Sequence, residues 1–234
     1  MQPVPAYVSV VFILTTSATV TFLILAMKGD AFRKLPSQVL ICLLPLWMII
    51  TGVLAAQGFY GHSEMWPPRI VVFAIFPALL TILLYFILFR KTFIDQLRIR
   101  DLTILHIVRI PVEIVLLWLF LAGGVPRSMT FEGRNLDILS GILAPIICFV
   151  AFRTRMENRW LIIAYNVLGL GLLINIVSIA VQAMPSPVFD PSSGPQNLAL
   201  QFFPYIWLPA VVVPIVLFSH LAALWKLVVV RDER

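Results

Sequence analysis

The chain has 234 residues, of which 61% are hydrophobic and 12% charged, and its mean hydropathy is +1.00. Soluble globular domains contain about 25% charged residues. This sequence is therefore too apolar for a water-soluble enzyme, a nucleic-acid-binding domain or a disordered chain. Its net charge of +6 is attributed to membrane topology rather than to a nucleic-acid partner. We expect one integral membrane domain that covers residues 1–234.

Seven apolar runs follow one another along the chain. Each has about the length of 20 residues that a membrane-spanning helix needs. The sequence thus predicts an all-α fold, a bundle of seven transmembrane helices. The expected spans cover residues 6–27, 39–58, 71–89, 102–123, 136–152, 160–184 and 205–230.

Basic residues are unevenly distributed among the predicted loops. If the N-terminus lies outside, most of the 17 Lys and Arg residues fall on the cytoplasmic side. The outer loops then keep only Arg69, Arg127 and Arg134. Cytoplasmic loops of membrane proteins carry an excess of Lys and Arg, so we expect an outside N-terminus and a cytoplasmic C-terminus.

The fourth predicted helix carries His106, Arg109 and Glu113. At 100° per residue, these three side chains project from one stripe of the helix. A charge at the bilayer centre costs about 2.5–3.5 kcal/mol on insertion scales, so such residues usually face protein and are often functional. Arg109 and Glu113 are four residues apart, and we expect their head groups to meet inside the bundle, directly or through one water. Pro111 lacks an N–H, which leaves the carbonyl of Ile107 without its helical donor.

Other predicted helices carry polar side chains at a similar depth. A rise of about 1.5 Å per residue places His220 of the seventh helix level with Arg109. Tyr165 and Asn166 of the sixth helix lie near that level. The candidate site for a ligand or a proton consists of His106, Arg109, Glu113, Tyr165, Asn166 and His220. The hydroxyl groups of the first helix are expected to bond backbone carbonyls of their own helix. They belong to Thr15, Thr16, Ser17, Thr19 and Thr21.

The sequence offers little for a metal or a cofactor. Three histidines, without an H-E-x-x-H pattern, do not supply converging metal ligands, so no metal site is expected. His106 and His220 would suit axial ligation of a haem if their helices left a gap of macrocycle size. A bis-His haem protein is therefore an alternative with lower rank, and otherwise no cofactor is expected.

The pattern His106-x-x-Arg109-x-Pro111-x-Glu113 is followed by Thr-Phe-Glu-Gly-Arg-Asn at residues 130–135. Together these segments resemble an uncharacterised family of multi-helix bacterial inner-membrane proteins. The resemblance covers the fourth and fifth predicted helices. It implies location in a bacterial cytoplasmic membrane, and it implies no activity and no functional residues.

Three functional hypotheses follow from these features. The first is small-molecule or proton-linked binding or transport through the polar site on the fourth helix. The second is a structural or partner-binding membrane subunit in which the ion pair only fixes packing. The third is a membrane enzyme, such as a bis-His haem redox protein, although the composition and the missing catalytic motifs favour a protein that is not an enzyme. The expected partners are the lipid bilayer and a small molecule or proton, and not nucleic acid.

Overall fold

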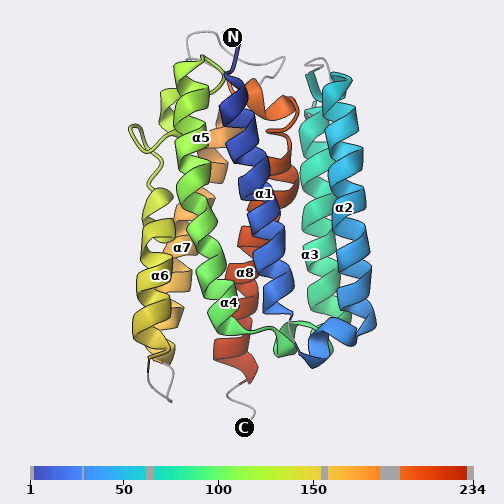
Figure 1. Ribbon diagram of the computed structural model, residues 1–234, viewed down its shortest axis with the longest axis vertical. Coiled ribbons are helices and arrows are strands. Elements are labelled where there is room, and N and C mark those ends of the chain that lie inside the picture. The colour runs from blue at the N-terminus through green and yellow to red at the C-terminus, as the bar shows by residue number, and fades with distance from the viewer. Residues whose placement is uncertain (1–2, 28, 62–65, 154–157, 185–195, 231–234) are drawn as a thin grey trace.

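The computed structural model describes residues 3–27, 29–61, 66–153, 158–184 and 196–230. All regular structure within these residues is helical. The main helices lie side by side along the long axis of the molecule, and the chain enters α1 at one end and leaves α8 at the other (Figure 1). The expected all-α class is confirmed.

Among the residues that the structure describes, six helical segments are long and apolar enough to cross a membrane. They are Ala6–Ala26 (α1), Leu35–Ala56 (α2), Val71–Leu88, Ile99–Leu121, Arg159–Gln182 (α7) and Leu208–Val229. Three of these segments are composite. The third joins a π-helix, Val71–Ile75, to α3 (Phe76–Leu88), and the fourth joins α4 (Ile99–Leu105), a 3-10 turn (His106–Val108) and α5 (Arg109–Leu121). The last joins a π-helix (Leu208–Val212), α8 (Val213–Trp225) and a further π-helix (Lys226–Val230).

The remaining helix, α6, differs from the sequence-based expectation. It covers Ile138–Ala151, only 14 residues, and at 1.5 Å per residue it is about 21 Å long. The hydrocarbon core of a bilayer is about 30 Å thick. The chain between α5 and α6 descends along the bundle before α6 begins (Figure 1). The described part of the chain thus has six helices of membrane-spanning length and one shorter apolar helix, where seven full spans were expected.

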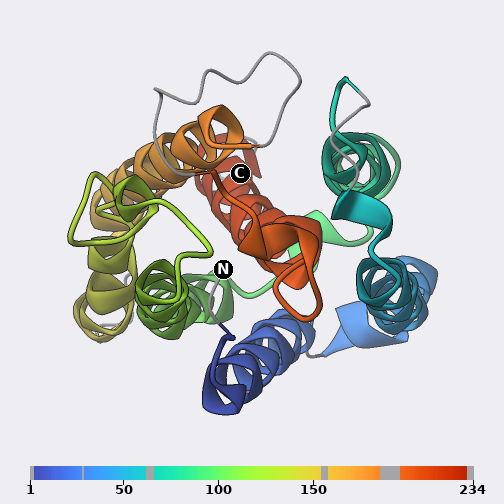
Figure 2. The ribbon, with the colours of Figure 1, turned by 90° about the horizontal axis from the view of Figure 1, so that it is seen from above.

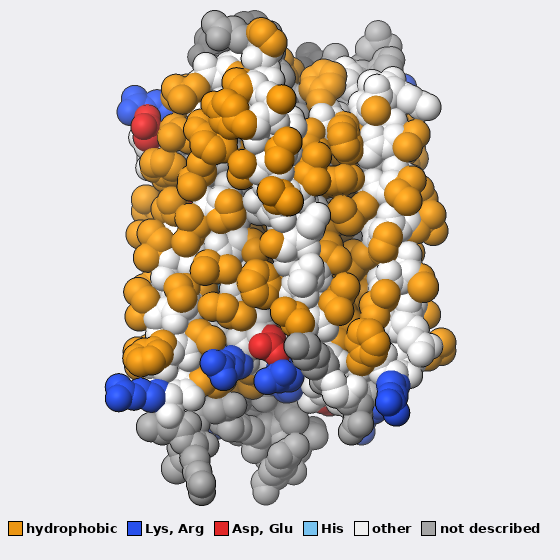
Figure 3. All heavy atoms as spheres, in the orientation of Figure 1, with side chains coloured by type: hydrophobic (Ala, Val, Ile, Leu, Met, Phe, Trp, Pro, Cys, Tyr) orange, Lys and Arg blue, Asp and Glu red, His pale blue; other side chains and the backbone are white. Residues whose placement is uncertain are grey.

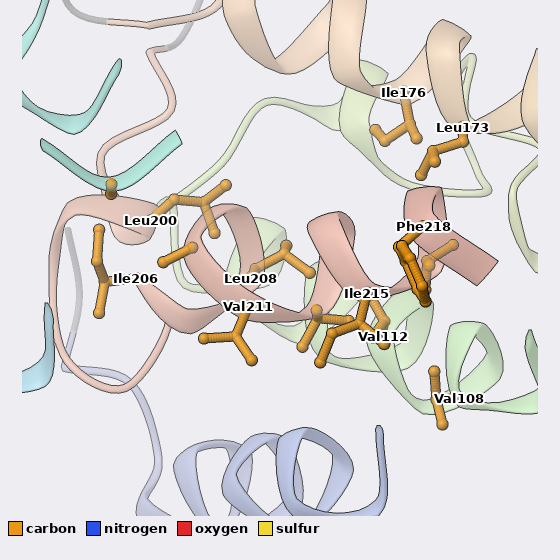
Figure 4. Close-up of a cluster of buried hydrophobic side chains, with 14 of the residues drawn as sticks. Val108, Val112, Leu173, Ile176, Leu200, Ile206, Leu208, Val211, Ile215 and Phe218 are labelled. Carbon is orange, nitrogen blue, oxygen red and sulfur yellow. The ribbon is translucent and has the colours of Figure 1, made fainter. Parts of the chain in front are cut away.

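Helix α8 lies at the centre of the arrangement, surrounded by α1, α4–α5 and α7, while α2 and α3 form one side (Figure 2). In the most apolar 18-residue stretch of the segment that contains α8, 61% of the residues are buried, whereas the corresponding value for the segment that contains α3 is 17%. Figure 4 shows the apolar contacts of this central helix. Ile215 and Phe218 of α8 lie among Val108 and Val112 of the α4–α5 segment and Leu173 of α7.

Proline shapes the contact between α8 and α2. Pro214 has no N–H, so the carbonyl of Ala210 has no helical donor. The indole Nε1–H of Trp47 donates to this carbonyl at 3.1 Å. In the opposite direction, Trp207 Nε1–H donates to the carbonyl of Met48 at 3.0 Å. The two indole hydrogen bonds attach the middle of α2 to the beginning of the last helical segment.

The outer surface matches a bilayer. Hydrophobic side chains cover the flanks, and Lys and Arg side chains gather around the end at which α8 finishes (Figure 3). Exposed large apolar residues occur on every membrane-length helix. A surface of this kind is soluble only in lipid, so the chain is an integral membrane protein.

Candidate functional site

Arg109 is the centre of a buried polar cluster. It lies about 15 Å along the helical segment that begins with α4, near its middle, and its side chain is 2% exposed. Nε donates to Asp137 Oδ2 at 2.6 Å, and Nη2 donates to Asp137 Oδ1 and, at 3.1 Å, to the carbonyl of Gly169. Nη1 contacts Ser140 Oγ at 2.7 Å and His220 Nε2 at 3.1 Å. A guanidinium has five N–H groups, and here each has an acceptor.

The ion pair of Arg109 is therefore with Asp137, and the expected direct contact with Glu113 is wrong. Both Arg109 and Glu113 are buried in the interior, as predicted. Because α6 begins deep in the bundle, it brings Asp137 against the guanidinium in a bidentate geometry, which is a favourable arrangement for this pair. Glu113 Oε1 instead accepts a hydrogen bond from Asn135 Nδ2 at 2.6 Å. Asn135 Oδ1 in turn accepts from the backbone N–H of Asp137 at 3.0 Å.

The hydrogen bonds around His220 define its tautomer. Asn166 Nδ2 donates to the carbonyl of Ile162 at 2.8 Å, so the Asn166 oxygen faces Nδ1 of His220 at 2.9 Å. An amide oxygen only accepts, so Nδ1 carries the hydrogen. Nε2 is then the acceptor that Arg109 Nη1 requires. His220 is therefore a neutral imidazole held from both sides.

His106 stacks on His220. The ring centroids are 3.7 Å apart and the planes differ by 11°. His106 is fully buried, and neither of its ring nitrogens has a hydrogen-bond partner among the described residues. Parallel rings in contact leave no space for a porphyrin between them, and both nitrogens of His220 are engaged. The two histidines, which the sequence predicted to lie at a similar depth, do not fit axial ligation of a haem.

Helix α7 closes the site with Tyr165 and Gly169. Tyr165 Oη donates to the carbonyl of Ser140 at 3.0 Å, which attaches α7 to the beginning of α6. A Cβ atom at Gly169 would lie 2.5 Å from His220 Cε1 and 2.9 Å from Ser140 Oγ. A Cβ at Gly141 of α6 would lie 2.9 Å from the side chain of Ile110. Close approach of α6 and α7 to the polar cluster thus depends on glycine at these two positions.

The segment between α5 and α6 is largely irregular, and part of it is buried. Met129, Thr130 and Asn135 are almost completely inaccessible, and Asn135 Nδ2 also donates to the Met129 carbonyl at 3.0 Å. The carbonyl of Gly124 accepts the backbone N–H groups of Leu198 and Ala199. Irregular backbone at membrane depth is tolerated only where protein or a water-lined cavity surrounds it. The buried part of the segment carries polar groups, such as those of Thr130 and Asn135, into the interior.

All six candidate residues predicted from the sequence are buried. His106, Arg109, Tyr165, Asn166 and His220 form one connected cluster, and Glu113 joins it through Asn135 and the backbone of Asp137. The predicted hydroxyl bonds in α1 are confirmed, because each of these side chains donates to the carbonyl four residues earlier.

Sequence reasoning missed the partners contributed by α6. In the predicted span 136–152, Asp137 and Ser140 lie at the outer end. Polar residues at that position would be in contact with water and would need no partner in the bundle. The available signal was length. The apolar run at 136–152 is the shortest of the seven, which is consistent with a helix that begins below the membrane surface.

Residues 66–228 match the family described as a domain of unknown function (DUF8737). The match covers well over half of the chain, so the chain belongs to this family. Comparisons with curated proteins and with solved structures gave no match. The matched region contains every residue of the polar cluster, and its function has to be inferred from the chemistry of that cluster.

Proposed function

We propose that this protein binds and moves protons across the membrane, alone or together with a small solute, and that Glu113 and His106 are the groups that exchange the proton. Arg109 and Asp137 form the fixed, mutually neutralising pair beside them. The first functional hypothesis was small-molecule or proton-linked transport through the whole polar site. The present proposal assigns the transported proton to Glu113 and His106, the titratable groups of the cluster whose hydrogen bonding is incomplete.

The supporting observation is the contrast between Arg109 and its neighbours. All donors of Arg109 are engaged, so this residue offers no free hydrogen-bonding group to a ligand. Glu113 Oε2 and both ring nitrogens of His106 are buried without a partner among the described residues. Each buried unsatisfied polar group costs about 1–3 kcal/mol. Such a cost at two titratable groups is explained if proton exchange is their function.

The position of these groups supports the same function. His106 and Glu113 are seven residues apart on one stripe of the helix, which corresponds to about 10 Å along its axis. Arg109 lies between them. Short helices joined to irregular segments near the middle of the membrane are common at ion and substrate sites of transporters, and α6 with the segment before it has this form.

The membrane setting of the proposal is specific. We place the protein in a bacterial cytoplasmic membrane with its N-terminus outside and its C-terminus inside, and with α6 plus the preceding segment as a seventh crossing. The gathering of basic side chains at the end where α8 finishes supports this orientation (Figure 3).

Infrared titration of the carboxyl groups is the direct test. Purified protein in lipid nanodiscs is taken from mildly acidic to mildly alkaline pH, and the carbonyl stretch of protonated carboxyl groups is recorded. We expect one band from a buried carboxylic acid to disappear on deprotonation, and to be missing in Glu113→Gln. The matched control is Glu132→Gln, because Glu132 is exposed in the segment between α5 and α6.

Proton flux provides the second measurement. Vesicles that contain the protein and an internal pH-sensitive dye are given an inside-negative membrane potential by potassium efflux. The internal pH is then followed. Wild type and Glu132→Gln should acidify the vesicles, whereas Glu113→Gln and His106→Phe should not. A Glu113 band that never titrates, together with equal flux in all four proteins, would refute the proposal.

A structural subunit is the second candidate, and the complete hydrogen bonding of Arg109 favours it. In that case, the cluster only locks α4–α5, α6, α7 and α8 together. Its signature would be variants of Glu113 and His106 that lose stability and show no titration or flux difference once folded.

A further inference from the structure

The structure contains an apolar cavity that no residue of the polar cluster lines. It has a volume of about 250 Å³ and lies between α2 and α3 on one side and α1 and α8 on the other. Its walls include Leu43 and Trp47 of α2, Ala78 of α3, and Val211 and Phe218 of the last helical segment. An apolar cavity of about 150 Å³ in a protein core stays dry and takes up benzene, so this larger cavity has room for an apolar ligand.

The chemistry of the walls favours an apolar ligand. Among the lining side chains, the hydroxyl groups belong to Thr81 and Tyr85. Thr81 Oγ1 donates to the carbonyl of Pro77 at 2.9 Å, and Tyr85 Oη donates to that of Pro36 at 2.8 Å. Both hydroxyl hydrogens are already donated to carbonyls, and the other lining side chains are apolar apart from the Trp47 indole N–H, which also has an acceptor, so the walls recognise a ligand mainly by shape and apolar contact.

Hydrogen bonds hold the cavity open at both ends. The Tyr85 bond attaches the lower part of α3 to the start of α2. The Trp47 indole, which donates to Ala210 at 3.1 Å, attaches the middle of α2 to the last helical segment. Between these attachments, Leu43 is exposed on the outer surface and also lines the cavity. The cavity is therefore reached sideways, from the hydrocarbon region of the bilayer.

The charges at the lower end indicate which lipid fits. Lys34 directly precedes α2, about 9 Å below Leu40 of the cavity wall, and Arg90 and Lys91 follow the end of α3. A phospholipid whose acyl chain entered the cavity would have its headgroup near these cations. Basic residues at the membrane surface attract anionic headgroups.

From this geometry we propose that the cavity is a binding site for one acyl chain of an anionic phospholipid. The chain enters between α2 and α3, and the headgroup contacts the basic residues at the lower ends of these helices. This site is separate from the proton site and does not depend on it. It also accounts for the low burial of α2 and α3, the two least covered of the membrane-length helices.

Photo-crosslinking tests the proposal on the full chain. The probe is phosphatidylglycerol with a diazirine in its acyl chain, and the labelled residues are mapped by mass spectrometry after reconstitution. We expect labels on Val211 and Phe218, which are 1% and 6% exposed and cannot be reached from the outer surface. The same chain on phosphatidylcholine should label them severalfold less. Labels confined to outward residues such as Leu46 and Leu83 would overturn the proposal, and equal labelling by both lipids would overturn its anionic part.

Ala78→Phe fills the cavity and should abolish labelling of Val211 and Phe218. The matched control is Leu80→Phe, on the lipid-exposed face of the same helix, which should leave the labelling unchanged. If Ala78→Phe fails to fold, Leu43→Trp blocks the entrance from an exposed position. Unchanged labelling of the buried residues in the folded blocking variant would refute entry through this cavity. The proposal would also be refuted if Val211 and Phe218 stayed unlabelled and Leu43 were crosslinked to a second copy of the chain instead of to lipid.

Discussion

Gly169 should be one of the least replaceable residues of the molecule. In Gly169→Ala the new Cβ would lie 2.5 Å from His220 Cε1 and 2.8 Å from Nε2. The imidazole cannot retreat easily, because Asn166 and Arg109 hold both nitrogens and His106 covers one face. Overpacking costs about 1–3 kcal/mol, and a hydrogen bond to a charged group contributes about 1.5–3 kcal/mol. A combined loss of about 3 kcal/mol is the expected magnitude.

Thermal unfolding in detergent measures this loss. For a chain of this size, 1 kcal/mol shifts Tm by about 2–4 °C, so Gly169→Ala should melt about 6–12 °C below wild type. The control is Gly171→Ala in the same helix, because a Cβ there meets no atom within 4 Å and alanine is the better helix former by about 1 kcal/mol. Equal Tm values for Gly169→Ala and wild type would refute the described packing of His220.

Other variants test the remaining contacts of the cluster. Arg109→Met alone should cost about 3–5 kcal/mol, because it leaves Asp137 as an unpaired buried charge, whereas the double variant with Asp137→Leu should recover much of this loss; additive losses would contradict the pair. Asn166→Leu should cost about 1–3 kcal/mol through the unpaired Nδ1–H of His220, while Asn175→Leu, whose amide bonds an exposed carbonyl, should stay within about 0.5 kcal/mol. A reporter enzyme that works only in the cytoplasm should be active when fused at the C-terminal end, and a reporter that works only in the periplasm should be inactive there. The opposite result would reverse the proposed orientation.

The sequence alone determined the helical membrane architecture, because the length of an apolar run can be read directly along the chain. Long uninterrupted apolar runs have one stable structure in lipid, since every backbone polar group must be satisfied within its own segment. The same reasoning identified His106, Arg109 and His220 as interior residues, because a polar or charged side chain at depth must face protein. Counting residues along two helices even placed His220 level with Arg109, and the two side chains are in contact.

Only the tertiary structure decided which groups pair. The spacing of Arg109 and Glu113 allowed a contact within one helix, yet α6 begins deep enough for Asp137 to accept from Nε and Nη2 of the guanidinium. Where a short helix starts depends on how the preceding segment packs, and that segment is held by contacts with residues almost 75 positions away in sequence, such as those of Gly124 with Leu198 and Ala199. Side-chain partners across helices depend on rotation and depth of each helix to within an ångström, and no local pattern in a single sequence encodes that.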